Sequence, residues 1–335
     1  DYLDYSNLVH TYQEIKDSII ELSCSLYSSR IIQRLVDLLD VNHKLDIFNV
    51  LIKDMFKLIR DCNGLHAVLK VIKEVKIIET SCDYNFSLQL QRNYPALSIN
   101  NIYHSIISNL YTLCCDKYGC CFIQKCLPLA YEDTKTMMIE IIMKSVVEFI
   151  SHSYANYVLQ EIITYMNPQH CSKILSLVSL NFLQYCKTKS TSNIIEKLMK
   201  YYSSPTLELV YSTIRKEKGF IKELIINSFG NYVFTCILDI CSNEVYIALL
   251  IECSHYQADI LEQPFGACFL KKLVEKHLKA KEYFNIEEIE QKIKDLPKIK
   301  SNPTPEDENI SPEERKKQKI LKIKKRRLKY IQKAN

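Results

Sequence analysis

The sequence predicts an all-α protein built as a solenoid of stacked repeats, with a period of about 36 residues. One short phrase recurs seven times between residues 26 and 274: an aromatic or polar residue, a tiny residue, two variable positions, two apolar positions and a third variable position. Counted from the residue after the tiny one, the copies begin at 29, 65, 120, 156, 192, 231 and 267, so four of the six intervals are 36 residues long. A fixed period of this size is typical of a solenoid, because each unit buries its apolar face only against its neighbours. Five glycines and nine prolines are too few for a turn-rich sheet protein.

Each phrase predicts the first turns of an inward-facing helix. Apolar residues follow at offsets +2, +3, +6 and +7 from the first variable position, which forms one stripe on a helix of 3.6 residues per turn. In the first copy these are Ile31, Ile32, Leu35 and Val36. The tiny position holds four of the five glycines, so we expect the backbone to approach a neighbouring segment closely there. The seven tiny residues are Ser28, Gly64, Gly119, Ala155, Thr191, Gly230 and Gly266.

The segments between the phrases predict outer packing helices and one insertion. Residues 139–150 and 175–185 are amphipathic, which indicates two or three helices in each repeat. The interval of 55 residues exceeds the period by 19, too few for another unit, so residues 78–101 are predicted to form an inserted loop. Such a loop fits either a partner-docking element or an idle surface insertion.

The solenoid is predicted to occupy residues 1–285, followed by a capping helix at 286–296, a proline-containing linker at 297–312 and a basic tail at 313–335. Residues 311–335 carry a net charge of +9 and the rest of the chain −4, so bulk charge does not indicate nucleic-acid binding by the solenoid. The tail fits a nuclear signal, a phosphate clamp or a solvated helix. We expect a cytoplasmic protein, with the tail as the element that would add a nuclear location.

Composition argues against several classes of protein. The chain is 47% hydrophobic and 25% charged, as folded proteins are, and no apolar run approaches the roughly 20 residues of a membrane helix. Its fourteen cysteines include no matched pair of Cys-x-x-Cys motifs, so we expect buried thiols and no metal site. No phosphate loop, nucleophile elbow or His-Glu-x-x-His motif is present, so neither an enzyme, a catalytic residue nor a cofactor is predicted.

The candidate binding residues are the variable positions 0, +1 and +4 of each phrase. Positions 0 and +4 lie one helical turn apart on one face, and position +1 is rotated by about 100°. The pairs at 0 and +4 are mostly polar: Ser29/Gln33, Cys120/Gln124, Asn156/Gln160, Ser192/Glu196 and Asn231/Thr235. The candidates for stacking at +1 are Arg30, His66, Cys121, Tyr157, Asn193 and Tyr232. Hydrogen-bonding pairs that alternate with stackers at one period suit a chain of bases spaced one per repeat.

These phrases resemble the repeats of the Pumilio/PUF family of RNA-binding proteins, over about residues 22–285. The resemblance implies a right-handed α-α superhelix and a monomer. It also implies that each repeat reads one base of a single-stranded RNA that runs antiparallel to the protein. The family usually has eight full repeats, and the resemblance implies that two of them are missing at the amino end of this chain.

Five triplets match the family's base-reading patterns. Ser192-Asn193-x-x-Glu196 matches the guanine triplet, since a carboxylate accepts both N–H groups of the guanine Watson–Crick edge. Asn156-Tyr157-x-x-Gln160 matches the uracil triplet. Cys120-Cys121-x-x-Gln124 matches the adenine pair, although Cys121 replaces the usual arginine or aromatic stacker. Two further triplets resemble an adenine reader and a terminal uracil reader with threonine in place of glutamine: Ser29-Arg30-x-x-Gln33 and Asn231-Tyr232-x-x-Thr235.

The resemblance also implies a target. The repeat at Leu65-His66-x-x-Leu69 lacks a polar edge reader and should accept any base, and Ala267-Cys268-x-x-Lys271 resembles a capping half-repeat. Read from the carboxyl end, the repeats spell 5′-UGUANA. A protein of this kind would bind such elements in mRNA 3′ untranslated regions and regulate translation or decay, with protein corepressors as further partners and no membrane.

Two alternatives remain open at this point. A divergent PUF-like protein could bind structured RNA in ribosome assembly, which the basic tail and the eroded repeats at Leu65 and Ala267 favour. A protein-binding solenoid of the HEAT or armadillo type would use the same concave face, but its repeats typically run longer.

Overall fold

The computed structural model describes residues 5–295, apart from the side chains of residues 84, 87 and 295. The chain divides into two compact units, Asp1–Phe284 and Asn285–Asn335. We call residues 5–284 the repeat unit. Of the second unit only helix α23 (Ile286–Asp295) is described, where a helix was predicted at 286–296. The predicted linker at 297–312 and basic tail at 313–335 lie outside the described residues.

The repeat unit consists of helices and their connections, as the sequence predicted, and residues 5–295 contain no strand. Each of its seven repeats has an outer helix, a short second helix and an inner helix. The outer helices are α1 (Tyr5–Ile15), α4 (Val41–Lys53), α8 (Ile99–Ser108), α11 (Glu132–Lys144), α14 (Pro168–Ser179), α17 (Ser203–Lys216) and α20 (Asn243–His255). The short helices are α2 (Ile19–Cys24), α5 (Met55–Ile59), α9 (Leu110–Cys115), α12 (Val146–Phe149), α15 (Phe182–Cys186), α18 (Phe220–Ile225) and α21 (Gln257–Leu261). The inner helices are α3 (Ser28–Leu38), α6 (Gly64–Ser81), α10 (Gly119–Cys126), α13 (Ala155–Ile162), α16 (Lys189–Tyr201), α19 (Gly230–Ile240) and α22 (Pro264–Lys276).

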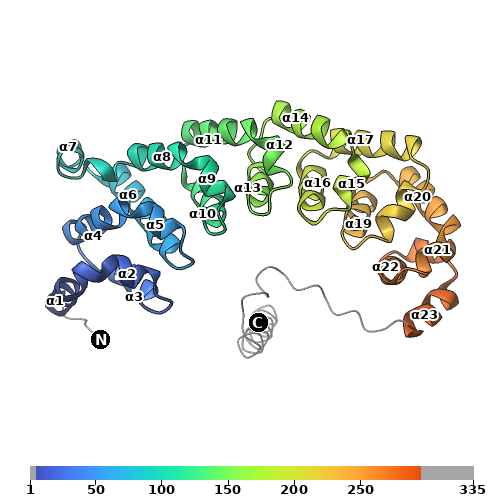
Figure 1. Cartoon of the computed structure of the whole chain (residues 1–335), viewed down its shortest axis with the longest axis horizontal. Helices are drawn as coiled ribbons and strands as arrows, with labels where there is room; N and C mark the ends of the chain where they lie inside the picture. The colour runs from blue at the N-terminus through green and yellow to red at the C-terminus, as the bar shows by residue number, and fades with distance from the viewer. Residues whose placement is uncertain (1–4, 296–335) are drawn as a thin grey trace. The chain divides into compact units, whose positions relative to one another are not determined.

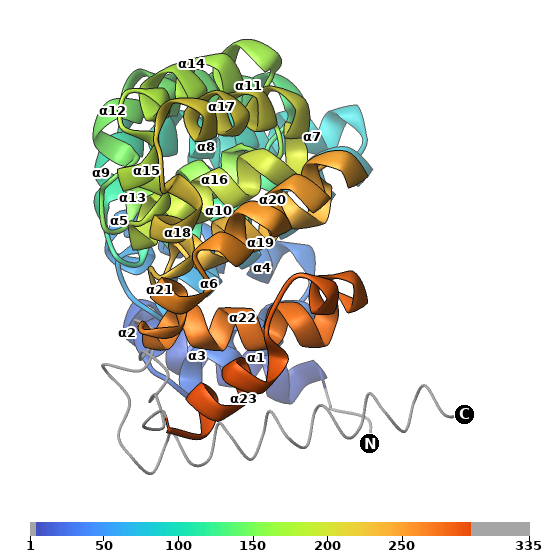
Figure 2. The same cartoon turned by 90° about the vertical axis from the view of Figure 1, so that its right-hand side faces the viewer.

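Outer and inner helices form two layers of an arched repeat unit. Figure 1 shows α8, α11, α14 and α17 along the upper, convex side and α10, α13, α16 and α19 along the lower side. In the end view of Figure 2, α11, α14 and α17 again lie together at the top. Four short 3₁₀ helices complete the connections: η1 (Lys16–Ser18), η2 (Pro95–Leu97), η3 (Leu127–Leu129) and η4 (Leu278–Glu282). None of the helices within residues 5–295 combines the length and the hydropathy that a membrane-spanning segment requires.

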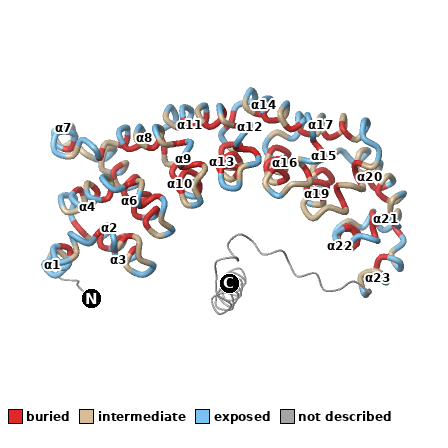
Figure 3. The backbone as a smooth tube through the Cα atoms, viewed as in Figure 1, coloured by how far each residue is buried: buried red, intermediate tan, exposed pale blue. Residues whose placement is uncertain are grey.

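The core runs through the unit between the two layers, where Figure 3 shows the buried segments. Inner helices pack side by side in the order α3, α6, α10, α13, α16, α19 and α22. The predicted apolar stripe is buried in the fifth repeat, where Ile194, Ile195 and Leu198 are fully inaccessible. In the first repeat Ile32 is buried but Ile31, predicted to be buried with it, is 61% exposed. The reason is the position of α3 as the first inner helix of the row: within the described residues no inner helix precedes it that could cover its +2 residue.

The start of each inner helix is packed against the short helix before it. A Cβ atom added to Gly119 would lie 2.5 Å from the carbonyl oxygen of Leu113, closer than any real contact. The side chain of Asp116 accepts hydrogen bonds from the backbone N–H groups of Tyr118 and Gly119, at 2.9 and 2.7 Å. The close backbone approach predicted from the tiny residue is therefore confirmed.

The insertion at 78–101 is helical, so the prediction of a loop there was wrong. Helix α6 continues to Ser81, and α7 (Tyr84–Asn93) begins where the Asp83 carboxylate accepts a 2.8 Å hydrogen bond from the backbone N–H of Phe86. The carboxylate of Glu79 then accepts a 2.9 Å hydrogen bond from the N–H of Ile99 and so holds the start of α8. The asparagines and Pro95 that indicated a loop instead occupy α7, α8, η2 and the turns between them.

Polar contacts at intervals of about one repeat tie the short helices together. The hydroxyl of Tyr111 donates to Glu148 across 2.8 Å, and Lys222 pairs with Asp259 across 3.0 Å. These pairs are partly exposed, so each contributes little energy. They join residues one repeat apart and so favour one relative position of successive repeats.

The glycine contact yields a test of the packing. We expect Gly119→Ala to lower the free energy of unfolding by about 1–3 kcal/mol, because the added methyl group overpacks the contact with the Leu113 carbonyl. Urea unfolding followed by circular dichroism measures the change. Ala155→Gly, at the same position of another repeat, is the matched control and should cost at most about 1 kcal/mol. A Gly119→Ala protein as stable as the wild type would show that the backbone has room to move.

Candidate functional site

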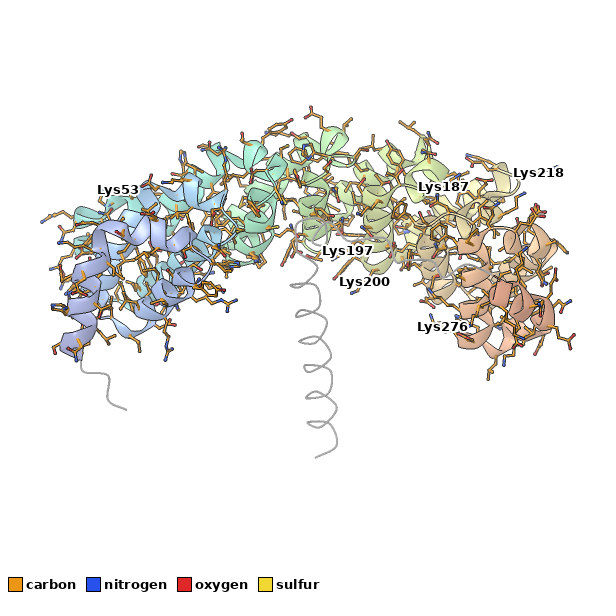
Figure 4. The ribbon with its side chains drawn as sticks, turned by 60° about the horizontal axis from the view of Figure 1, so that its bottom comes forward. Lys53, Lys187, Lys197, Lys200, Lys218 and Lys276 are labelled. Carbon is orange, nitrogen blue, oxygen red and sulfur yellow. The ribbon has the colours of Figure 1, made fainter. Side chains whose placement is uncertain are left out.

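The inner helices carry all the predicted site residues on one side of the repeat unit. The residues at 0, +1 and +4 lie in the first turns of α3, α6, α10, α13, α16, α19 and α22, which pack in one row. Figure 4 brings this side forward, with Lys197 and Lys200 of α16 near its middle. Residues from seven separate segments therefore form one continuous surface, which we call the inner face.

Position 0 is recessed. Ser29, Cys120, Asn156 and Ser192 are buried, with at most 4% of their surface exposed, and Asn231 is partly buried. The Asn156 amide is held by its neighbours: its Nδ2 donates to the carbonyl of His152 across 2.6 Å, and its Oδ1 accepts from Nε2 of Gln160 across 3.0 Å. The uracil-type pair is therefore oriented before any ligand arrives.

Position +4 is more open and polar. Gln33 and Gln124 each donate a 3.0 Å hydrogen bond from Nε2 to the carbonyl of position 0 in the same helix, which orients the two amides alike. Thr235 also contacts position 0, since its hydroxyl donates to the carbonyl of Asn231 across 2.8 Å. With its proton engaged, that hydroxyl offers a ligand an acceptor only, a narrower set of contacts than a glutamine amide provides.

Position +1 is the most exposed of the three. Arg30, His66, Cys121 and Tyr232 are exposed, and Tyr157 and Asn193 are partly buried. Tyr232, with 54% of its surface accessible, presents a broad ring face. Recessed edge groups beside exposed flat groups are the arrangement that unstacked bases require, because a base needs contacts on both its edge and its face.

The carboxylate of Glu196 lies in a pocket of about 480 Å³ between α16 and α19, which we call the α16–α19 pocket. Its walls include Gln160, Asn193, Lys197 and Cys236. Burial raises the pKa of Glu196 above its ordinary value. Burial, and next the charge of Glu196, raise the pKa of Cys236 to about 11. A partly desolvated carboxylate without an ion pair in the described chain suits a ligand that donates two N–H groups.

A second pocket of about 540 Å³ lies between α3, α6 and α10, and we call it the α3–α6–α10 pocket. Gln33 and Gln124 line it from the first and third repeats. Leu69 and Lys73 line it from the second, where no polar edge reader exists. The pocket therefore coincides with the repeat that the sequence predicted to accept any base.

Sequence reasoning missed the basic residues of the inner face. Offset +5 is basic in five of the seven repeats, and these residues are Arg34, Lys70, Lys125, Lys197 and Lys272. The signal was present in the sequence, at the same period as the phrase. It was hidden because acidic residues elsewhere cancel it in the net charge of the solenoid.

The cysteines form no disulfides, and no group of metal-ligating side chains occurs in residues 5–295. Cys114, Cys120 and Cys126 are buried as predicted, and burial contributes to raising the pKa of each thiol, for Cys120 after the hydrogen bond to Cys121. Cys121 is exposed on the inner face, where the prediction of a weak stacker had placed it.

Comparison with known proteins identifies the repeats. A family model described as the Pumilio-family RNA binding repeat matches residues 18–52, 109–143 and 145–179. Each match begins one residue before the short helix of a repeat, and all three include a complete phrase. This match decides against the HEAT or armadillo alternative.

Curated relatives agree with the family model. A Pumilio domain-containing protein of Schizosaccharomyces pombe is 25% identical over 271 residues, which cover 81% of this chain and 37% of the relative. Pumilio homolog 12 of Arabidopsis thaliana is 22% identical over 271 residues, 80% of this chain and 42% of the relative. The chain thus spans less than half the length of these relatives.

Solved structures share the fold. The crystal structure of PUF-8 in complex with PBE-RNA superposes with a TM-score of 0.63 at 20% identity, covering 82% of this chain and 76% of that one. The Puf3 RNA binding domain bound to the Cox17 RNA 3′ UTR recognition sequence site A gives 0.58 at 22% identity, with 74% and 71% covered. At this identity the likeness establishes the curved helical-repeat superhelix.

The exposure of the thiols on the inner face can be tested directly. We expect brief treatment of the native protein with a maleimide to label Cys62 and Cys121, which are exposed, and to leave Cys114, Cys120 and Cys126 unlabelled, because a buried thiol with a raised pKa is scarcely ionised. Peptide mass spectrometry reads out each site, and urea-unfolded protein is the control for full labelling. Equal labelling of Cys120 and Cys121 would contradict the recessed geometry of position 0.

Proposed function

Because this chain is a Pumilio (PUF) repeat protein, we propose that it binds single-stranded RNA along the inner face, one base to each repeat. The observation that carries this proposal is the repeated arrangement of three positions on the inner helices: recessed at 0, partly open at +4 and exposed at +1. Each repeat thus presents one position for stacking on a base and two positions that face the edge of a base. Bases that are unstacked from each other and inserted between stackers satisfy such a surface.

The proposed contact with guanine uses Ser192, Asn193 and Glu196. The carboxylate of Glu196 would accept the N1 and N2 hydrogens of the base, as a guanine Watson–Crick edge requires. Position 0 adds the recessed hydroxyl of Ser192, whose Oγ donates a hydrogen bond to the carbonyl of Lys189 across 3.3 Å. Adenine presents the N1 acceptor where guanine presents N1–H, and uracil presents the O2 acceptor where guanine presents N2–H, so each would leave at least one carboxylate oxygen unpaired.

The proposed contacts with uracil and adenine use the amide pairs. Asn156 and Gln160, already hydrogen-bonded to each other, would read the third base as uracil. Gln124 and Gln33 would read adenines at the fourth and sixth positions, with Leu65 and Leu69 opposite the unread fifth base. Tyr232 would stack at the first base, where Thr235 offers weaker selection for uracil. The predicted target is 5′-UGUANA.

The biological role we propose is the regulation of mRNA translation or decay through elements in 3′ untranslated regions, in the cytoplasm. The Puf3 domain, which shares this fold, is bound to a 3′ UTR recognition sequence in its solved structure, which supports this choice. The proposed role is one of binding without catalysis. The proposal that the protein binds structured RNA in ribosome assembly is the alternative that the following binding measurement distinguishes.

The first test is fluorescence-anisotropy binding at physiological salt. We expect a short RNA containing UGUAUA to bind about 100-fold or more tightly than one in which the first four bases are ACAC, since each mismatched base costs roughly 1–3 kcal/mol. Equal affinity for the two RNAs would favour the structured-RNA alternative. Absence of binding to both would contradict RNA reading altogether.

The raised pKa of Glu196 predicts a pH dependence for guanine recognition. The free carboxyl must ionise to accept two N–H groups, and its pKa lies above the ordinary value because of burial. As pH falls from about 7.5 to 5, the preference for guanine over uracil at the second base should therefore weaken, and it should be full at neutral pH and above. Paired titrations with UGUAUA and UUUAUA RNA measure this preference.

Glu196→Gln is the matched control for this titration. Its amide cannot ionise and offers one acceptor oxygen, so its preference for guanine should be small and independent of pH. A guanine preference that stays constant to pH 5 in the wild type, or that falls equally in the variant, would exclude Glu196 as the reader.

A further inference from the structure

The α3–α6–α10 pocket differs from the reading surface around it in both shape and chemistry. The second repeat contributes Leu69, Lys70 and Lys73 of α6 to its lining, and α10 contributes Lys125. Its volume of about 540 Å³ exceeds that of the α16–α19 pocket, about 480 Å³, although no edge reader faces it from the second repeat. The apolar side chain of Leu69 offers no hydrogen bond to a base edge.

The positive charge of this pocket is only partly neutralised. Lys70 pairs with Asp37 and with Glu74, and Glu74 also pairs with Lys44 across 3.3 Å. The ion pairs of the described residues include neither Lys73 nor Lys125, both of which are exposed. Three lysines, Lys70, Lys73 and Lys125, thus line the pocket and only Lys70 is in an ion pair, which leaves an excess of positive charge.

The pKa of His66 is affected by the same excess of positive charge. This side chain lines the pocket at position +1 of the second repeat. Desolvation lowers the pKa of His66 first, and the charges of Lys125 and Lys73 lower it further. Both lysines therefore act on the ring and disfavour a third positive charge there.

The α16–α19 pocket has the same lysine spacing with the opposite result. Lys197 and Lys200 of α16 stand at the offsets that Lys70 and Lys73 occupy in α6. There, however, Glu196 and Asp239 line the pocket beside them, so the charges balance and a neutral base with N–H donors is favoured. The two pockets thus differ in the charge of the residues that line them.

We propose that the α3–α6–α10 pocket is a phosphate site, in which Lys73 and Lys125 bind the RNA backbone beside the unread fifth nucleotide. This assignment rests on the proposed function, which aligns the second repeat with that nucleotide. An internucleotide phosphodiester carries one negative charge and presents two acceptor oxygens, which two lysine ammonium groups that line one pocket can bind together. The second repeat therefore retains its strand through the backbone and leaves the base unread.

The test combines a protein variant with a chemically modified RNA. The variant Lys73→Gln/Lys125→Gln should bind UGUAUA RNA roughly tenfold more weakly than the wild type, and the slope of log K against log salt should fall by about 0.7 for each phosphate that is no longer neutralised. An RNA with uncharged methylphosphonates at the two linkages flanking nucleotide 5 should weaken binding to the wild type similarly and have little further effect on the variant.

Matched controls separate this site from general charge effects. Lys53→Gln/Lys218→Gln removes the same charge from exposed lysines that line neither pocket and lie toward opposite ends of the repeat unit in Figure 4, and it should bind within about twofold of the wild type. Methylphosphonates flanking nucleotide 2, beside the balanced α16–α19 pocket, should matter less than those flanking nucleotide 5. An abasic nucleotide 5 should weaken binding less than the flanking methylphosphonates do, because it removes only the stacking contact with His66.

Three outcomes would overturn the inference while leaving base reading intact. The methylphosphonates could weaken the lysine variant as much as the wild type, the two double variants could behave alike, or removal of base 5 could weaken binding about tenfold while the methylphosphonates do not. The last result would make the pocket a base site. Failure of the wild type to prefer UGUAUA over the ACAC-containing RNA would instead refute the proposed function, and the phosphate assignment with it.

Discussion

The structure depends on one close contact, made where each short helix turns into its inner helix. The carbonyl six residues before the tiny residue faces it directly: Leu113 against Gly119 and Leu224 against Gly230. In the fifth repeat Thr191 meets the equivalent carbonyl, of Tyr185, with its hydroxyl. Because this contact sets where the inner helix begins, it also sets which side chains of that helix reach the inner face. Positions 0, +1 and +4 count from this point, so base reading depends on backbone packing.

Stacking then converts a local geometry into an ordered surface. The inner helices pack in sequence, and polar pairs such as Tyr111 with Glu148 join residues one repeat apart. Each repeat thereby holds its reading residues at a similar displacement from the previous set. A linear ligand with a regular spacing of flat groups can follow such a surface, whereas a compact ligand would contact few repeats. The order of readers along the chain thus becomes the order of bases along the proposed RNA.

The helical class, the inner helices and the glycine contact could be predicted from sequence because each is encoded at a fixed period. The helical insertion could not, since the asparagines and proline of residues 78–101 favour turns, and the structure is decided by distant partners such as Glu79 with Ile99. The break between outer and short helices was also missed. Ser145, for example, separates α11 from α12 without a glycine or proline. The desolvation of Glu196 was equally hidden, because it requires α19 beside α16. Local chemistry predicts candidate binding residues, and packing reveals the electrostatic setting in which they lie.

The second repeat shows what that setting adds. Loss of its polar readers at Leu65 and Leu69 would, in a purely base-reading solenoid, leave a gap with no attraction for the ligand. The inner helix of this repeat nevertheless contributes Lys70 and Lys73 to the pocket, and α10 contributes Lys125. Since Lys70 is already engaged by Asp37 and Glu74, the charge available to a ligand comes from Lys73 and Lys125. The phosphate is a charged part of every nucleotide that does not depend on its base, so under the proposed assignment a repeat that discards base selection while concentrating positive charge remains a binding repeat. The proposed mode of binding thereby assigns selectivity and affinity to different repeats of one continuous face.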